Sequence, residues 1–319
     1  MADDPLIAAL PSELAHRVQS LRRVGGRVTV VADASGMAEA GREALERGIM
    51  DALATQPGVE AVHVAITAEK PRRRMIAIGS GKGGVGKSTL TTNLAVALAR
   101  AGRPVGVVDA DIYGPSQPTL LGTGEDKPAA EGDRLVPVAT RFGVPVLSMG
   151  HLIAPGRAIA WRGPMAGKAL SQLIDAHWGD TELLLIDLPP GTGDVQLTML
   201  QRFKPDGALI VSTPQDLALI DAARAGQLLD GAEVPIIGLV ENMAGYRCPH
   251  CGETSDPFGH GGIEAAAARL DLPFLGRIPL APAICEASDR GVPPAAGDGA
   301  EGAAFAGIAA RLGEWLDRN

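Results

Sequence analysis

The stretch MIAIGSGKGGVGKSTLTTNLAVAL, residues 75–98, decides the fold of this chain. Its first four residues are apolar and predict a buried strand, and residues 87–100 carry apolar side chains at helical spacing. Between strand and helix lies the pattern Gly-x-x-x-x-Gly-Lys-Ser, which is typical of a loop that binds phosphate groups. Glycines allow such a loop to turn its backbone N–H groups toward phosphate oxygens at the N-terminus of the helix.

This loop predicts a site for a nucleoside triphosphate, with ATP as the expected ligand. Lys87 is expected to reach the β- and γ-phosphates, and the Ser88 hydroxyl to bind Mg²⁺. Lys82 is a second lysine that the pattern does not require, so it is either an exposed bystander or a group that reaches a partner chain's nucleotide. The expected nucleotide-binding residues of the loop are Gly81, Lys82, Gly83, Gly84, Val85, Gly86, Lys87, Ser88 and Thr89.

Further short apolar runs alternate with helical patterns along the rest of the chain. This alternation of strand and helix patterns predicts an α/β protein with a mostly parallel sheet that is covered by helices on both faces. Ligands of such sheets bind at the carboxyl ends of the strands, and the polar motifs of this chain follow the apolar runs. The runs are Val105–Val108, Leu183–Ile186, Ala208–Val211 and Ile236–Val240.

Three aspartates follow two of these runs. Asp109 and Asp111 could hold Mg²⁺ through water or orient the attacking water, whereas a helix cap or a turn is the plainer interpretation. Asp187 ends a later run and is expected to hold Mg²⁺. The segment from Asp187 to Asp194 contains two prolines and two glycines, and such a turn can move when the γ-phosphate leaves. The candidates for catalysis are therefore Lys82, Lys87, Asp109 and Asp111.

Residues 1–70 differ from the rest of the chain and predict a small α+β domain. Its expected elements are a strand Val28–Val31, a helix from Met37 to Leu53 and a strand Val59–Ile66. The charged, proline-containing segment Glu69–Arg74 is expected to link it to a second domain, residues 75–319, with a charged entry into a strand as the alternative. Within the second domain, the Gly, Pro and acidic residues of Glu125–Asp133 predict a loop.

Composition limits the classes of function. The net charge is −8 and the pI is about 5.3, whereas general nucleic-acid binders are usually basic. The chain opens with MADDPLIAAL, and no apolar run approaches transmembrane length. We therefore expect a cytoplasmic protein that binds neither nucleic acid nor membrane, with its three cysteines reduced.

Cys248 and Cys251 form a Cys-x-x-Cys pair, which is half a metal site because zinc and [4Fe–4S] clusters normally take four protein ligands. The pair could act as a redox dithiol. It could complete a zinc site with His250, His260 or Cys285 of the same chain. Two copies of the chain could also meet and supply four thiolates. Cys285 lies in an expected helix and is interpreted as a small packing residue.

The glycine-rich loop resembles the deviant Walker A motif of the family that includes the septum-positioning and chromosome-partition ATPases and the nitrogenase iron protein. The signature lysine of that family acts across a nucleotide-sandwich dimer, so the resemblance implies a homodimer and gives this role to Lys82. The sequence Val-Asp-Ala-Asp, residues 108–111, is similar to the family's switch I acids.

A narrower resemblance, to the Mrp-type (ApbC-type) iron–sulfur cluster carriers, covers residues 74–319. It rests on DLPPGTGD (187–194), DIYGPS (111–116), WRGPM (161–165), ENM (241–243), FGHGG (258–262) and LGRIPL (275–280). The resemblance implies Mg²⁺-dependent ATP hydrolysis and a [4Fe–4S] cluster that Cys248 and Cys251 of two subunits hold together. Cluster donors and apo-proteins would be the partners, and zinc in the same site is an alternative. By the family pattern Asn242 contacts the adenine edge, with a plain turn residue as the alternative.

The N-terminal domain resembles a shortened form of the small domain that often precedes Mrp-type ATPases, but it lacks that domain's cysteine. A docking or structural role is therefore expected for it. The alternative function is a spatial-regulation ATPase, and the tail, residues 303–319, lacks the basic cluster that membrane-binding members carry. A nitrogenase-like electron donor would need two separated single cysteines in each chain.

Overall fold

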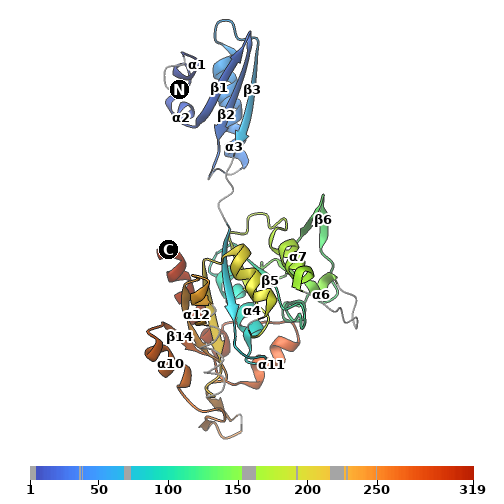
Figure 1. Cartoon of the computed structure of the whole chain (residues 1–319), viewed down its shortest axis with the longest axis vertical. Coiled ribbons are helices and arrows are strands. Elements are labelled where there is room, and N and C mark those ends of the chain that lie inside the picture. Colours follow the sequence, from blue (N-terminus) through green and yellow to red (C-terminus); the bar gives the residue numbers. More distant parts are fainter. Residues whose placement is uncertain are drawn as a thin grey trace. The chain divides into compact units, whose positions relative to one another are not determined.

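A computed structural model of the chain describes residues 5–35, 37, 39–67, 73–152, 163–191, 193–215, 226–227, 229–248 and 250–319. The chain divides into two compact units, Met1–Arg73 and Arg74–Asn319. Each unit has its own sheet and helices (Figure 1). Each also contains its own hydrophobic core.

The first unit is a three-stranded sheet with one long helix. Its elements are α1 (Pro5–Ala8), α2 (Ser12–Ala15), β1 (Val18–Val24), β2 (Arg27–Asp33), α3 (Glu39–Ala54) and β3 (Ala61–Thr67). The strand order is β1-β2-β3, with β1 antiparallel and β3 parallel to β2. The sequence pattern predicted β2, α3 and β3 but not β1. Every residue of β1 is at least partly exposed, so this edge strand has no apolar run to reveal it.

The second unit contains the predicted parallel sheet. Its strands are β4 (Arg74–Gly79), β5 (Val105–Asp109), β8 (Val146–Ser148), β9 (Leu183–Asp187), β10 (Gly207–Ser212), β11 (Ile236–Glu241) and β14 (Phe274–Arg277). The order across the sheet is β14-β11-β10-β4-β9-β5-β8, and every neighbouring pair is parallel. The five apolar runs lie in the five central strands. The two edge strands, β8 and β14, are short and were not predicted.

Helices cover both faces of this sheet, as predicted (Figure 1). Successive side chains of β4 point to opposite faces, so Ile76 and Ile78 belong to one core cluster and Met75 and Ala77 to the other. The first cluster is completed by α4 (Lys87–Arg100) and α12 (Ala300–Arg318), and the second by α7 (Gly163–Ile174) and α10 (Gly262–Leu270). The fold is the α/β arrangement expected from the sequence.

Short elements connect these layers. They are α5 (Gln117–Leu120), β6 (Ala129–Glu131), β7 (Arg134–Val136), α6 (Met149–Leu152), α8 (Asp194–Thr198), the π-helix η1 (Met199–Phe203), β12 (Tyr246–Arg247), β13 (Thr254–Ser255), α11 (Pro282–Asp289) and the 3₁₀-helix η2 (Pro294–Ala296). The prediction of a loop over residues 125–133 is wrong in its second half, because β6 pairs with β7 in a hairpin there. Nowhere in the described part of the chain does a helix have the length and apolar character needed to cross a membrane.

A first prediction concerns the independence of the second unit. A chain that lacks residues 1–70 should unfold cooperatively, with a midpoint within about 4 °C of that of the second unit in the whole chain. The reason is that the core of the first unit shares no residue with the two core clusters of the second. Thermal unfolding followed by circular dichroism measures this, and a truncated chain without a cooperative transition would contradict it.

Candidate nucleotide site and cysteine hairpin

The glycine-rich loop connects β4 to α4 at the carboxyl edge of the sheet. Gly84 and Gly86 have φ angles of 78° and 85°, in the left-handed region that favours glycine, and α4 begins directly after Gly86. The loop borders a pocket of about 190 Å³. The pocket is lined by Ser80, Lys82, Gly83, Gly84, Gly86, Lys87, Ser88, Thr89, Asp111 and Pro190. The fold thus brings together the loop, one acid that follows β5, and the turn that follows β9.

Asn242, which directly follows β11, supports the glycine-rich loop. Its Nδ2 donates a hydrogen bond to the Val85 carbonyl at 2.8 Å, and the residue is 9% exposed. A Cβ atom on Gly86 would lie 2.0 Å from the same Nδ2, so a larger residue at 86 would displace this amide. Asn242 therefore contacts the backbone of the phosphate loop, while its contact with adenine stays a prediction.

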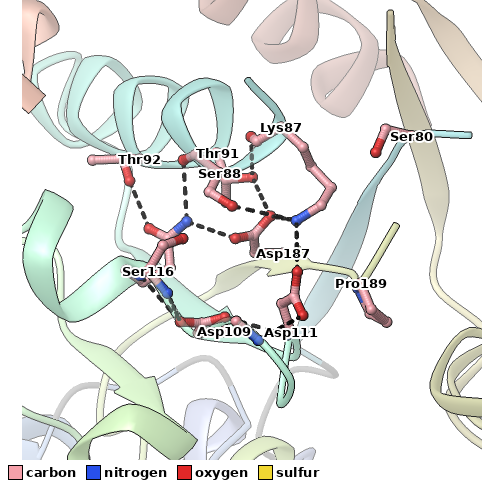
Figure 2. Close-up of polar contacts among 12 residues, drawn as sticks. Ser80, Lys87, Ser88, Thr91, Thr92, Asp109, Asp111, Ser116, Asp187 and Pro189 are labelled. Carbon is pink, nitrogen blue, oxygen red and sulfur yellow. Dashed lines mark hydrogen bonds and ion pairs between the residues drawn. The ribbon is translucent and has the colours of Figure 1, made fainter. Parts of the chain in front are cut away.

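Lys87 lies among oxygen atoms at the base of the pocket. Its Nζ is 2.5 Å from Oδ1 of Asp187, 3.3 Å from Oγ of Ser88 and 4.0 Å from Oδ2 of Asp111 (Figure 2). The Lys87 side chain is 6% exposed and that of Asp187 is fully buried. A buried carboxylate needs a partner of opposite charge, and Lys87 supplies it. The ammonium is thus held where the loop would present phosphate oxygens to it.

Both oxygens of the Asp187 carboxylate have partners. Oδ1 accepts from Lys87 and, at 3.3 Å, from the Thr91 hydroxyl, whereas Oδ2 accepts from Nε2 of Gln117 at 2.9 Å. The Gln117 side chain is fully buried and also bonds to the Ser88 carbonyl at 3.1 Å. Nothing in the sequence pattern distinguishes Gln117, although it directly follows the segment DIYGPS. Only the packing of α5 against α4 brings it to the site.

The two acids of the Val-Asp-Ala-Asp motif, Asp109 and Asp111, occupy different places. Asp109 is fully buried behind the pocket, and its Oδ2 accepts hydrogen bonds from the backbone of Ser116 and Gln117 and from the Ser148 hydroxyl, at 2.9–3.1 Å. Asp111 lines the pocket, and its Oδ1 accepts from the Gly114 N–H at 3.2 Å. The geometry therefore makes Asp109 the anchor of the 110–117 segment and leaves Asp111 facing the pocket.

Burial dominates the electrostatics of both acids. It raises the pKa of Asp109 to about 7, with a further contribution from the negative charge of Asp187 and opposition from the Gln117 N–H and the Ser148 hydroxyl. Burial also raises the pKa of Asp111 above its usual range, and the Lys87 ammonium opposes that rise. Lys82 differs from these residues because it is exposed at the pocket, which is compatible with either role predicted for it.

Cys248 and Cys251 lie at the tip of a hairpin formed by β12 and β13. The hairpin is closed by hydrogen bonds of 2.9 Å from the Gly252 N–H to the Cys248 carbonyl and from the Cys248 N–H to the Glu253 carbonyl. Three hydrogen-bond donors lower the pKa of the Cys248 thiol. The backbone N–H of Cys251 has the largest effect, the backbone N–H of His250 the next largest, and the Cys251 thiol the smallest. The turn thus favours the thiolate, which is the form that binds metals. Cys251 is exposed.

The same-chain zinc site predicted as one option does not assemble. Among the residues that the structure describes, no group of three His, Cys, Asp or Glu side chains is placed to hold a metal ion. Cys285 is exposed in α11, with its Sγ 4.0 Å from Oδ2 of Asp289, so its interpretation as a packing residue is wrong.

Residues 161 and 162 of the WRGPM segment lie outside the described residues.

A second prediction follows from the buried Asp109. Since its folded-state pKa is raised, the folded state holds a proton that the unfolded state releases from about pH 4 upward. Its contribution to stability is therefore lost as the pH rises from about 4 to about 7. Between about pH 5.5 and pH 8 the wild-type free energy of unfolding should fall by up to about 2 kcal/mol more than that of Asp109→Asn.

Urea unfolding of both proteins at the two pH values measures this difference. Asp180 is an exposed carboxylate, so Asp180→Asn serves as the control and should keep the wild-type pH dependence. An Asp109→Asn variant that loses stability with pH as steeply as the wild type would contradict the prediction.

Comparison with known proteins agrees with this geometry. Residues 72–312 match a family model described as ParA, NUBPL iron-transfer P-loop NTPase. An Escherichia coli protein named iron–sulfur cluster carrier protein is 44% identical over 240 residues, which are 75% of this chain and 62% of that protein. The carrier protein of Methanocaldococcus jannaschii is 46% identical over 224 residues, 69% of this chain and 77% of that one. The chain thus spans less than two thirds of the E. coli relative.

Solved structures show the same fold. A nucleotide-binding protein from Archaeoglobus fulgidus in complex with ADP is 42% identical and superimposes with a TM-score of 0.61, covering 68% of this chain and 86% of that one. The cell division ATPase MinD of Pyrococcus furiosus is 28% identical, with a TM-score of 0.56 over 76% of this chain and 99% of its own. The resemblance predicted from the loop and from residues 187–194 is confirmed, and the chain belongs to the NUBPL iron-transfer family of P-loop NTPases.

Proposed function

We propose that this chain is an ATP-hydrolysing carrier of iron–sulfur clusters. The observation that carries the proposal is the presence, in one unit, of a phosphate loop with acids at its pocket and of an exposed hairpin bearing Cys248 and Cys251. Relatives that are 44–48% identical bear the name iron–sulfur cluster carrier protein, which supports the same cargo for this chain.

The residues that line the pocket, together with Asp187 buried beneath Lys87, suit a nucleotide with Mg²⁺. Ser88 and Asp187 offer a hydroxyl and carboxylate oxygens, the donor atoms that Mg²⁺ prefers. A bound Mg²⁺ would neutralise charge on the phosphates. MinD from Pyrococcus horikoshii, 26% identical with a TM-score of 0.54, is described as a complex with Mg-ADP, which supports this assignment.

Hydrolysis would use residues that already lie at the pocket or directly behind it. The Lys87 ammonium would move from Asp187 to the β- and γ-phosphate oxygens, a short displacement within the pocket. Asp111 would accept a hydrogen bond from the water that attacks the γ-phosphorus, while the bond to the β-phosphate oxygen breaks. Asp109 would act by holding the 110–117 segment, because its Oδ1 accepts from the Asp111 N–H and its Oδ2 from two backbone N–H groups and the Ser148 hydroxyl.

The functional unit in this proposal is a homodimer. One chain offers two thiolates, and a [4Fe–4S] cluster needs four, so two hairpins would meet and hold the cluster between subunits as cargo. Within the described part of the chain, no group of three His, Cys, Asp or Glu side chains is placed to hold a metal ion, which supports this arrangement. Lys82, exposed at the pocket, would reach the nucleotide of the partner subunit. Apo-proteins would receive the cluster, and zinc would fit the same four thiolates.

The nucleotide and cysteine sites are joined through β11. Asn242, the residue after this strand, bonds to the Val85 carbonyl of the phosphate loop, and the cysteine hairpin starts four residues later. The root of the hairpin is held by hydrogen bonds from the Ala244 N–H to the Ile278 carbonyl and from the Leu280 N–H to the Gly245 carbonyl. A change in the phosphate loop would therefore reach the hairpin through a short, hydrogen-bonded stretch of backbone, which supports nucleotide control of the cluster.

A spatial-regulation ATPase is the second candidate, favoured by the structural similarity to MinD. Membrane-binding members of that class use an amphipathic helix with a free apolar face. The C-terminal helix of this chain, α12, instead buries Phe305, Leu312 and Leu316 in the core beside α4. This packing favours the carrier over the regulator.

A third prediction tests the nucleotide site. Lys87→Ala should weaken ATP binding by at least about 100-fold and abolish hydrolysis, because the charge-assisted contacts to the phosphates are lost. Lys82→Ala is the matched control from the same loop. It should bind ATP almost as the wild type does and still lose hydrolysis, because its lysine acts on the partner's nucleotide. Calorimetric titration and phosphate release measure both, and hydrolysis by Lys87→Ala at the wild-type rate would refute the assignment.

The fourth prediction tests the cargo. After anaerobic reconstitution with iron and sulfide, the wild-type dimer should contain about four irons and four sulfides. Cys248→Ala and Cys251→Ala should each lose the cluster and its visible absorption, whereas Cys285→Ala should keep both because that thiol is remote in sequence and lies in α11. A double variant of Cys248 and Cys251 that still holds a full cluster would eliminate the carrier function. Zinc without sulfide in the wild type would indicate a zinc-bridged dimer instead.

A further inference from the structure

We propose that Gln117 is a positioning residue that gives the two carboxylate oxygens of Asp187 different tasks, one structural and one for Mg²⁺. The inference rests on the proposed nucleotide site and concerns its metal specifically. Gln117 belongs to α5, and its side chain reaches the end of β9, seventy residues later in the chain.

The orientation of the Gln117 amide follows from its neighbours. Its Nε2 faces two acceptors, Oδ2 of Asp187 at 2.9 Å and the Ser88 carbonyl at 3.1 Å. Its Oε1 faces a donor, the Thr92 hydroxyl, at 2.6 Å. The reversed amide would place an oxygen against a carboxylate and a carbonyl, so only this orientation satisfies the buried groups. Gln117 therefore always donates to Oδ2.

The opposite oxygen of Asp187 has exchangeable partners. Oδ1 accepts from the Lys87 ammonium at 2.5 Å and from the Thr91 hydroxyl at 3.3 Å, and Thr91 also bonds to the Lys87 carbonyl at 3.0 Å (Figure 2). When phosphate oxygens attract the ammonium, Oδ1 loses its strongest partner and Oδ2 keeps Gln117. The Lys87 ammonium that contacts Oδ1 also lies 3.3 Å from the oxygen of the Ser88 hydroxyl. Oδ1 is thus the oxygen that would become available to a Mg²⁺ ion or its bound water.

Gln117 also connects this carboxylate to the segment that carries Asp111. Its backbone N–H donates to Oδ2 of Asp109 at 3.1 Å, while its side chain holds Asp187. Residues that orient metal ligands from behind commonly change metal affinity by 10–100-fold when they are replaced. Removing the Gln117 amide should therefore weaken Mg²⁺ binding. The partner that it loses in the phosphate loop is the Ser88 carbonyl, not an N–H group that would face phosphate.

The experiment compares ADP affinity with and without Mg²⁺ in the full chain, using a fluorescent ADP analogue. Gln117→Leu keeps the bulk of the side chain and removes its hydrogen bonds. Gln196→Leu is the matched control, since Gln196 is also buried but donates to the Pro189 carbonyl rather than to Asp187. In EDTA both variants should bind ADP as the wild type does. The Mg²⁺ concentration that gives half of the affinity gain should rise about 10-fold in Gln117→Leu alone.

A milder variant protects the test against misfolding. Thr92→Val removes only the hydrogen bond to Oε1 of Gln117 and should raise the required Mg²⁺ concentration by a smaller factor. An unchanged Mg²⁺ requirement in Gln117→Leu, or in Thr92→Val if the first variant does not fold, would overturn the inference. Equal losses of ADP affinity in EDTA and in Mg²⁺ would also overturn it, because they indicate a purely structural role. A wild type whose ADP affinity ignores Mg²⁺ would instead refute the proposed metal site, and this inference with it.

Discussion

The rest of the nucleotide site depends on one fully buried carboxylate, that of Asp187, at the end of a central strand. A charge in this position is costly unless it is paired and its remaining oxygen is hydrogen-bonded. Lys87 provides the opposite charge, and Gln117 occupies the other oxygen. The helix α4, the strand β9 and the short helix α5 must therefore be held in one arrangement. The same arrangement forms the floor of the phosphate pocket.

The parallel sheet explains how residues far apart in sequence reach that pocket. Strands β4, β5, β9 and β11 all end at one edge, so the segments that follow them meet there. This edge gathers the phosphate loop, Asp111, the turn after Asp187, and Asn242. The cysteine hairpin continues from the same segment as Asn242. The phosphate loop and the cysteine pair thus belong to one framework without sharing residues.

A sequence pattern predicts a strand or helix where buried residues recur at a regular spacing along the chain. It fails to predict an element whose residues show no such regularity. The five central strands are continuous apolar runs because helices cover both of their faces. The partly exposed strand β1 and the three-residue strand β8 carry no such run, so neither was predicted. The helix of Cys285 was predicted correctly, but spacing alone does not tell which side of a short helix faces solvent.

The sequence by itself determined the phosphate loop, the parallel α/β fold, the acids at the strand ends and the paired cysteines. These features depend on the local spacing of residues or on the order of the elements, and both can be read directly from the sequence. Only the tertiary structure separated buried Asp109 from pocket-lining Asp111, which are two residues apart in one motif. It alone brought Gln117 to Asp187 and Asn242 to Val85. Those contacts arise from how the elements pack, and hydrogen bonds between distant segments leave no periodic trace in a single sequence.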